Sequence, residues 1–270
     1  MAQGLERLAD MFARCRSEQR GALMPFLVGG HPKPGLTGDL IRAADRAGAD
    51  ALEIGFPFSD PIADGPVVAA AMHEALQAGA TPLGVLEEVA AVRSSTDAAL
   101  IAMVSVSIVS RLGGPGSFVP RAVEAGFDGF IFPDMTVEEA ETHAKVCDEH
   151  GVGCSLLIAP TTPAARVRQI AAVTRGFIYL LARAGITGER DEAPDIRARV
   201  DAIRTITDLP IAVGFGISNA QHVRAVVEHA DAAIVGSALV RRIGAEPDGA
   251  AGAVERFVGE LRSGCGRAGN

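Results

Sequence analysis

Short apolar runs alternate with helical patterns along the whole chain. Eight runs have the length and composition of buried strands and lie at 22–28, 50–56, 99–107, 128–132, 154–159, 176–182, 210–215 and 232–237. Segments with the apolar spacing of helices lie at 36–47, 66–79, 115–126, 136–150, 163–173, 195–206, 218–229 and roughly 250–263. Strands that alternate with helices in this way predict βαβ units and a parallel sheet.

The strand runs are almost continuously hydrophobic, which is typical of strands covered on both faces. Eight such units in a chain of 270 residues fit a closed α/β barrel, the (β/α)8 or TIM barrel, better than an open doubly wound sheet. We therefore predict one (β/α)8 barrel domain over residues 1–270. An amphipathic helix before the first strand should flank or plug its bottom, and a short extra helix should follow the last strand.

Composition narrows the possible partners. The net charge of −8 argues against a nucleic-acid surface and against an anionic membrane, although it permits an anionic substrate in a local pocket. Cys15, Cys147, Cys154 and Cys265 show no metal-binding spacing and indicate reduced thiols of a cytoplasmic protein. The N-terminal stretch carries charges throughout, unlike a signal peptide, and no apolar run is long enough to span a bilayer.

One predicted strand contains a carboxylate. Glu53 lies between Leu52 and Ile54, and Asp60 and Asp64 follow in the next loop. Burying an unpaired carboxylate costs several kcal/mol or keeps it protonated. Because barrel enzymes place their active-site residues at the carboxyl ends of strands, Glu53 and Asp64 are candidates for acid–base work. The alternatives are a structural Glu53 held by backbone amides or an arginine, and an Asp64 that only forms the turn in "ADGP".

Two glycine-containing segments end the last two strands. They read "VGFGIS" at 213–218 and "IVGSALV" at 234–240, and in the second Gly236 and Ser237 precede a helix. Backbone N–H groups at a helix start bind phosphate, and glycine lets the ligand come close. Their position after the last two strands matches the recurrent phosphate site of these barrels, whereas the alternative is a pair of tight turns.

The segment after the sixth strand reads "YLLARAGITGERDEAPD". It contains Tyr179, the only tyrosine, followed by Arg183, Thr187 and Gly188. We interpret it as a mobile lid with a phosphate-facing glycine. An ordinary exposed loop preceded by a core tyrosine remains possible.

Missing residues restrict the chemistry further. The only lysines, Lys33 and Lys145, lie outside the predicted strands, which argues against a Schiff-base aldolase. The six histidines are scattered, which argues against a metal-dependent aldolase. The first and fifth strands end in "FLVGGHP" and "LLIAPTT" without the aspartate of many phosphosugar isomerases. Acid–base chemistry by Glu53 and Asp64 on a phosphorylated substrate remains, with no metal and no cofactor.

The segment "LEIGFPFSDPIADGP" resembles the signature of the tryptophan synthase alpha subunit family. "YLLARAGITG", "VGFGIS" and "IVGSALV" match that family in order and spacing, and the resemblance covers nearly the whole chain. It implies an eight-stranded barrel that cleaves indole-3-glycerol phosphate to indole and glyceraldehyde 3-phosphate, in tryptophan biosynthesis. It also implies a pyridoxal-phosphate-dependent beta subunit as partner in an alpha2-beta2 complex.

The resemblance also implies a role for each candidate residue. Glu53 would be the principal acid–base catalyst, Asp64 would bind the indole N–H, and Tyr179 would lie beside Glu53. Thr187 would close the lid onto Asp64. The further substrate-binding residues would be Phe26, against the indole ring, and Arg183. The phosphate ligands would be Gly188, Gly216, Gly236 and Ser237.

The sequence differs from the family in three loops. The loop after the third strand reads "MVSVSIVSRLGGPG", without the usual tyrosine and asparagine. Thr136 stands where a proline is usual, and "VGGHP" replaces a more acidic loop after the first strand. These changes bear on the interface with a beta subunit more than on catalysis. Alternative functions are a different phosphosugar lyase or isomerase on the same barrel, and a catalytically weak regulator that binds a partner.

Overall fold

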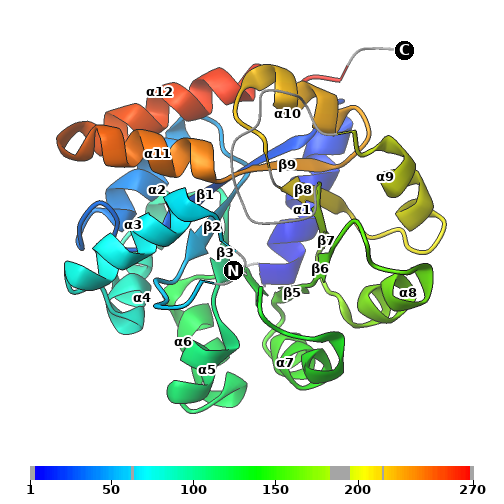
Figure 1. Cartoon of the computed structure of the whole chain (residues 1–270), viewed down its shortest axis with the longest axis horizontal. Coiled ribbons are helices and arrows are strands. Elements are labelled where there is room, and N and C mark those ends of the chain that lie inside the picture. The colour runs from blue at the N-terminus through cyan, green and yellow to red at the C-terminus, as the bar shows by residue number, and fades with distance from the viewer. Residues whose placement is uncertain (1–3, 62–63, 183–194, 215, 268–270) are drawn as a thin grey trace.

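A computed structural model describes residues 4–61, 64–182, 195–214 and 216–267. Its strands form a parallel barrel with helices around the outside (Figure 1). The predicted (β/α)8 class is confirmed. None of the described helices has the length and apolar character that a bilayer crossing requires.

The sheet contains nine strands in the described residues, in the order β5-β4-β3-β2-β1-β9-β8-β7-β6, and every pairing is parallel. Their bounds are β1 Ala22–Val28, β2 Ala51–Gly55, β3 Ala99–Met103, β4 Gly129–Ile131, β5 Gly153–Ser155, β6 Leu157–Ile158, β7 Ile178–Leu181, β8 Ile211–Gly214 and β9 Ala232–Val235. Only Leu156 separates β5 from β6, and its carbonyl accepts the N–H of Tyr179. The two pieces therefore occupy one of the eight predicted strand positions and close the barrel.

The described helices cover the outside of the sheet, except α1, which lies across one end of the barrel (Figure 1). They are α1 Gly4–Ser17, α2 Thr37–Arg46, α3 Pro66–Gln77, α4 Pro82–Ala90, α5 Val106–Arg111, α6 Pro115–Ala125, α7 Val137–Glu149, α8 Ala164–Val173, α9 Arg197–Arg204, α10 Ala220–Val227, α11 Ser237–Ala245 and α12 Ala250–Arg262, with short 3-10 turns at Arg93–Ser95 and Pro247–Gly249. Helix α11 is the expected short helix after the last strand.

The structure corrects the sequence-based expectation in two places. Helix α4 was not predicted; it begins at Pro82, after the N-cap residue Thr81, whose side chain accepts the N–H of Gly84. The predicted strand at 99–107 ends at Met103, because Ser105 caps helix α5 by accepting the N–H of Ser107. The serine-rich end of that apolar run is therefore a helix start at the barrel mouth.

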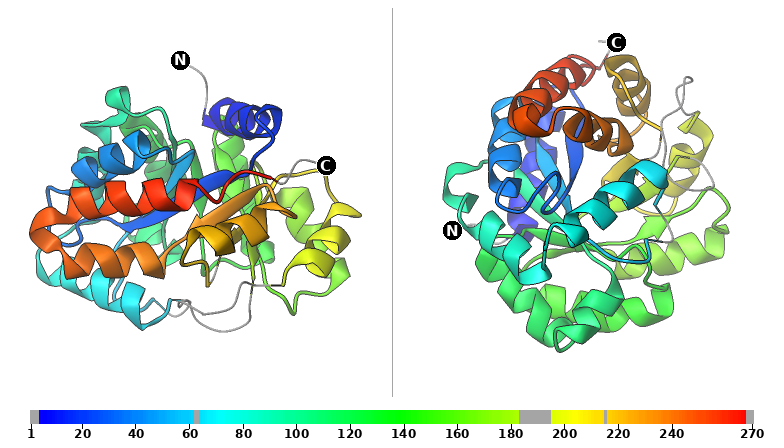
Figure 2. Two further views of the ribbon diagram at one scale, coloured as in Figure 1. Left: turned by 90° about the horizontal axis from the view of Figure 1, so that it is seen from above. Right: turned by 60° about the vertical axis from the view of Figure 1, so that its left-hand side comes forward.

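Alternation along each strand separates the barrel interior from the outer core. On β2, Ala51 belongs to the interior cluster, whereas Leu52 and Ile54 pack in the outer core under the helices. Glu53 lies between these two outward-facing residues, so its side chain points into the barrel. Helix α1 closes the end of the barrel at which the strands begin (Figure 2). Its Leu8 side chain belongs to the barrel-interior cluster.

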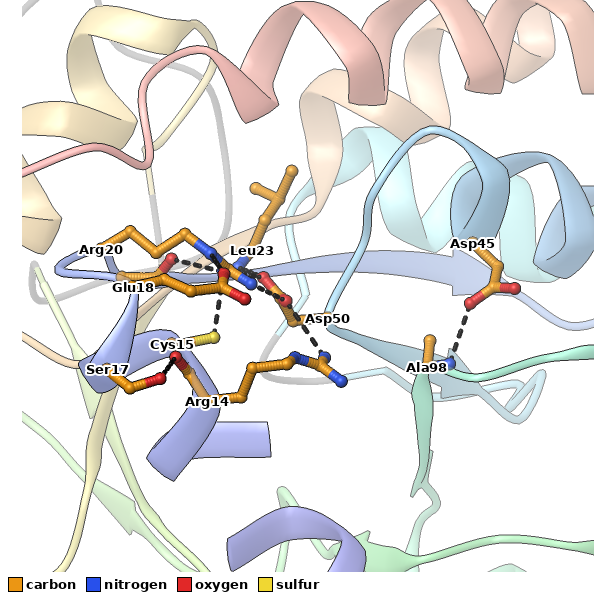
Figure 3. Close-up of polar contacts among 10 residues, drawn as sticks. Arg14, Cys15, Ser17, Glu18, Arg20, Leu23, Asp45, Asp50 and Ala98 are labelled. Atoms are coloured by element: carbon orange, nitrogen blue, oxygen red, sulfur yellow. Dashed lines mark hydrogen bonds and ion pairs between the residues drawn. The ribbon is translucent and has the colours of Figure 1, made fainter. Parts of the chain in front are cut away.

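Charged groups are paired at the amino ends of the strands. The carboxylate of Asp50 is 3% exposed, accepts two hydrogen bonds from the guanidinium of Arg20 at 2.7 and 2.8 Å, and accepts the N–H of Leu23 at 3.0 Å (Figure 3). Arg20 also donates to the sulfur of Cys15. This cluster ties α1, β1 and β2 together at the end of the barrel remote from the strand carboxyl ends.

The same arrangement recurs at two other strands. Asp128 precedes β4 and accepts the N–H of Leu100 at 2.8 Å, while Asp231 precedes β9 and accepts the N–H of Ile211 at 2.9 Å. Arg93 pairs with the first of these carboxylates. Each aspartate links the start of its own strand to the neighbouring strand, which leaves the carboxyl ends to carry function.

Candidate active site

Glu53 is completely buried in the barrel interior. Its backbone lies between Phe26 on β1 and Ile101 on β3. Neither carboxylate oxygen has a hydrogen-bond partner among the described residues. Burial raises the pKa of Glu53 well above its usual value, so the neutral acid is the favoured form. The alternative was a structural Glu53 whose carboxylate is held by backbone amides or by an arginine. Among the described residues no such partner contacts either oxygen.

Tyr179 lies on β7 and belongs to the barrel-interior cluster. A Cβ atom placed on Gly214 would lie 2.4 Å from the tyrosine hydroxyl, so the phenol packs directly against this glycine of β8. The pKa of Tyr179 is raised by burial first, and then by the negative charges of Glu53 and Asp64. These three predicted site residues therefore lie near one another.

Asp64 lies at the end of the loop between β2 and α3. Its N–H donates to the carbonyl of Pro61, and Pro66 opens helix α3 two residues later. Proline suits a first helical turn because its missing N–H has no acceptor there. Burial raises the pKa of Asp64 to about 6, so this carboxyl group titrates close to neutral pH.

A cavity of about 230 Å³ opens beside Asp64, between the loops that follow β2, β3 and β4. The residues that line it include Asp60, Asp64, Met72, Met103, Ser105 and Ser107. Glu53 does not line this cavity but lies deeper, on β2. The site thus has a buried acid inside the barrel and a half-buried acid at its mouth.

Phe26 connects this acidic region with Gly236, the residue that follows β9. A Cβ atom on Gly55 would meet the Phe26 ring at 2.5 Å, and one on Gly236 would lie 3.9 Å from the Cβ of Phe26. The aromatic ring therefore covers the end of β2, close to Glu53, as expected for a residue that walls an apolar substrate.

The start of α11 has free backbone donors. The N–H groups of Leu239 and Val240 donate to the carbonyl of Gly236, which leaves the N–H groups of Ser237 and Ala238 without an intrahelical acceptor. Ser237 is itself buried. Such a helix start attracts anions through its N–H groups and its dipole.

Gly216 lies beside this region, after β8, with a φ of 81° that favours glycine. Its carbonyl oxygen is 3.2 Å from Nδ1 of His222, whose ring is 4% exposed. His222 lies in the first turn of α10, and its N–H donates to the side chain of the N-cap residue Asn219. We did not expect a role for His222 from the sequence; the capping residue three positions before it was the available signal.

Asp134 is a second residue whose role the sequence did not reveal. It accepts the hydroxyl of Ser105 at 2.6 Å and the N–H of Val106 at 3.0 Å, which holds the loops after β3 and β4 together. Three predicted site residues, Arg183, Thr187 and Gly188, lie outside the described residues, as does most of the predicted lid. Their roles remain predictions.

Comparisons with known proteins place the chain in a family. A family model described as "Tryptophan synthase alpha chain" matches residues 12–264. The tryptophan synthase alpha chain of Solibacter usitatus is 39% identical over 265 residues, covering 97% of this chain and 99% of the relative. That of Thermosynechococcus vestitus is 42% identical over 259 residues, covering 95% and 97%.

Solved structures agree with these relatives. A structure of Mycobacterium tuberculosis tryptophan synthase matches with a TM-score of 0.89 and 30% identity over 100% of both chains. Tryptophan synthase subunit alpha from Legionella pneumophila matches with a TM-score of 0.87 and 31% identity, over 96% of this chain and 97% of the other. The chain belongs to the tryptophan synthase alpha chain family.

Proposed function

We propose that this chain is a lyase that cleaves indole-3-glycerol phosphate to indole and glyceraldehyde 3-phosphate, in the cytoplasmic synthesis of tryptophan. The observation that carries the proposal is the completely buried and unpaired carboxyl group of Glu53, close to Tyr179 and to a second acid, Asp64. Burial raises the pKa of this carboxyl group above its ordinary value, which suits a residue that must both give and take a proton.

The reaction needs two proton transfers and one stabilised charge. Neutral Glu53 donates its proton to C3 of the indole ring, which places positive charge on the ring nitrogen. The ionised carboxylate of Asp64 at the ring N–H stabilises that charge. The resulting Glu53 carboxylate then takes the proton of the hydroxyl on the side-chain carbon attached to C3. As that hydroxyl becomes a carbonyl, the C–C bond breaks and its electrons neutralise the ring.

The remaining elements hold the substrate. Phe26 covers the end of β2 and fits an aromatic ring, while the start of α11 with Gly216, Gly236 and Ser237 fits a phosphate group. Gly188, Arg183 and Thr187 would complete the site from the lid. Remote binding at the phosphate orients the reacting carbon against Glu53.

We further propose that the chain assembles with a beta subunit. One similar structure is a tryptophan synthase complex from Pyrococcus furiosus, with 31% identity and a TM-score of 0.83 over 90% of this chain. The loops after β2, β3 and β4 lie together around one cavity, and they would form the docking face.

The deciding experiment is an assay of the isolated chain for indole release from indole-3-glycerol phosphate. Glu53→Gln should lower turnover by about 10²–10⁴-fold, because the amide cannot exchange the proton. Glu124→Gln, which changes an exposed residue on α6, is the matched control. Retention of more than about a tenth of the turnover in Glu53→Gln would rule out its catalytic role. Absence of indole release by the wild-type chain, both alone and with a beta subunit, would refute the proposed reaction.

A further inference from the structure

The ring of His222 donates to the backbone of the loop that follows β8. It is buried in the first turn of α10. Its Nδ1 atom is 3.2 Å from the carbonyl oxygen of Gly216 and 3.4 Å from the hydroxyl oxygen of Ser218. Because a carbonyl oxygen can only accept a hydrogen bond, the contact with Gly216 requires the proton on Nδ1.

This hydrogen bond holds a peptide group at a flexible position. Gly216 has a φ of 81°, and glycine has more accessible backbone conformations than any other residue. A donor on its carbonyl oxygen fixes the plane of the peptide bond between Gly216 and Ile217. In a trans peptide the N–H points opposite to the carbonyl, so the N–H of Ile217 points away from the His222 ring.

The N–H of Ile217 is available to a ligand. Ile217 is buried, and its N–H donates to no acceptor in the part of the chain that the structure describes. Buried backbone N–H groups are nearly always paired, and one without a protein acceptor indicates a bound ligand or an ordered water molecule.

The loop after β8 lies beside the start of α11. Strands β8 and β9 pair in parallel, with Val213 opposite Ala233. Gly216 follows the last residue of β8 by two positions, and Gly236 directly follows β9. The two loops therefore leave the same edge of the sheet side by side. Backbone N–H groups of both, including that of Ser237, can contact one anion.

We propose that His222 is a positioning residue for the phosphate group of the substrate. Through Gly216 it holds the loop after β8 so that the backbone N–H groups of this loop, that of Ile217 among them, face the anion. The inference rests on the proposed function, since it takes the phosphate to lie between this loop and the start of α11. His222 acts through the backbone, so its loss weakens phosphate binding and leaves the chemical step at Glu53 unchanged.

Binding of inorganic phosphate to the whole chain, measured by isothermal titration calorimetry, tests this role without the reaction. His222→Leu removes the donor and should raise the Kd for phosphate by about 2–10-fold, the usual effect of one hydrogen bond. His222→Asn places an amide N–H near the position of Nδ1 and should restore most of the affinity. The matched control is His150→Leu, an exposed position at the end of α7 near the start of β5, which should leave the Kd unchanged.

Steady-state kinetics with indole-3-glycerol phosphate separate positioning from a general structural role. A contact that is equally strong in the bound substrate and in the transition state affects KM and not kcat. We therefore expect His222→Leu to raise KM by about 2–10-fold and to keep kcat within about twofold of wild type. A merely structural role would lower the thermal unfolding temperature without changing the Kd of the folded protein.

Nitrogen NMR of the histidine rings provides a measurement that does not depend on the folding of His222→Leu. We expect the His222 signal, assigned by its loss in His222→Asn, to show a protonated Nδ1. An unprotonated Nδ1 would overturn the proposal, because it could not donate to the carbonyl of Gly216.

The two proposals can fail separately. An unchanged phosphate Kd in folded His222→Leu, an equal rise in His222→Asn and His222→Leu, or no phosphate binding by the wild-type chain would overturn the role of His222. In each case, indole release by the wild-type chain would still support the proposed function. Phosphate binding that depends on His222 in a chain that releases no indole would support the positioning role and refute the proposed reaction.

Discussion

The hydroxyl of Tyr179 packs against the Cα of Gly214, and a Cβ atom on that glycine would lie 2.4 Å from the hydroxyl and 2.9 Å from the ring carbon that bears it. Gly214 has no positive φ, so alanine is allowed by the backbone and only the contact with Tyr179 opposes it. We expect Gly214→Ala to push the ring towards Glu53 and Asp64 and to lower kcat/KM by at least about tenfold, because small displacements in an active site are costly.

The control for this substitution is Gly259→Ala on α12, where an added Cβ meets nothing within 4 Å. Alanine in a helix interior should stabilise the protein by about 0.5–1 kcal/mol and leave activity unchanged. Steady-state kinetics and thermal unfolding of both variants provide the measurement. Wild-type activity in Gly214→Ala would show that the position of Tyr179 has no influence on the reaction.

The buried acid makes stability depend on pH in a defined direction. Burial raises the pKa of Glu53 in the folded chain well above 4.5, its ordinary value. Between these two pKa values Glu53 binds more protons in the folded state than in the unfolded state, so its contribution to the stability of the wild-type chain falls as pH rises above about 4.5. Glu53→Gln carries no titrating group, and its free energy of unfolding relative to wild type should therefore increase with pH.

Urea unfolding of both proteins at several pH values tests this dependence. Glu124→Gln on the exposed face of α6 should show no such trend relative to wild type. A difference between Glu53→Gln and wild type that stays constant from acidic to neutral pH would mean that Glu53 is not desolvated in solution.

The titration of Asp64 should set the acidic limb of the pH dependence of kcat/KM. Its pKa of about 6 is raised by burial, and the carboxylate must be ionised to stabilise positive charge on the indole ring. We expect kcat/KM to fall below about pH 6 with a slope of one. Asp64→Asn should lower activity at every pH and remove this limb. A limb that persists in Asp64→Asn would assign the titration to another group.

The opposite end of the barrel should affect stability alone. Asp50→Asn removes the buried charged partner of the Arg20 guanidinium and leaves it only its ion pair with the exposed Glu18. Breaking a buried pair costs about 3–5 kcal/mol, and the remaining pair with Glu18 places the expected loss at the lower end of this range. Asp39→Asn, which breaks an exposed pair with Arg42, should cost less than about 1 kcal/mol. Denaturant unfolding measures both, and kcat/KM of the folded variants should stay within about twofold of wild type. A large loss of activity in folded Asp50→Asn would contradict the separation of the two ends.

The barrel could be predicted because its strands are continuous apolar runs and its turns are rich in glycine and proline. Helix α4 was missed because it follows α3 after a short connection, so two helices share one crossover. The end of β3 was misplaced because Ser105 follows an apolar run without a break, and its capping role appears only when Asp134 is brought to it.

The candidate site could be predicted where a residue type conflicts with its expected surroundings. Glu53 in an apolar strand was such a residue, and the glycines at the ends of the last two strands indicated close approach by a ligand. Contacts between segments were not predictable from the sequence. The His222 ring meets the carbonyl oxygen of Gly216, and the Asp134 carboxylate accepts the Ser105 hydroxyl, only once the chain has folded.

The loop after β3 bears on pairing with a beta subunit. Helix α5 presents Ser107 and Ser110 as exposed residues, and Gly113 and Gly114 follow it with φ values of 94° and 81°. Short hydroxyl side chains and glycines reach less far across an interface than the tyrosine and asparagine usual in the family. We therefore expect a beta subunit from a conventional complex, such as that of Pyrococcus furiosus, to bind weakly and to raise indole formation little.

Indole formation with and without saturating beta subunit, together with size-exclusion chromatography, provides the measurement. A stable complex with more than about tenfold activation would show that contacts of the loops after β2 and β4 suffice for coupling, because tenfold corresponds to about 1.4 kcal/mol of transition-state stabilisation.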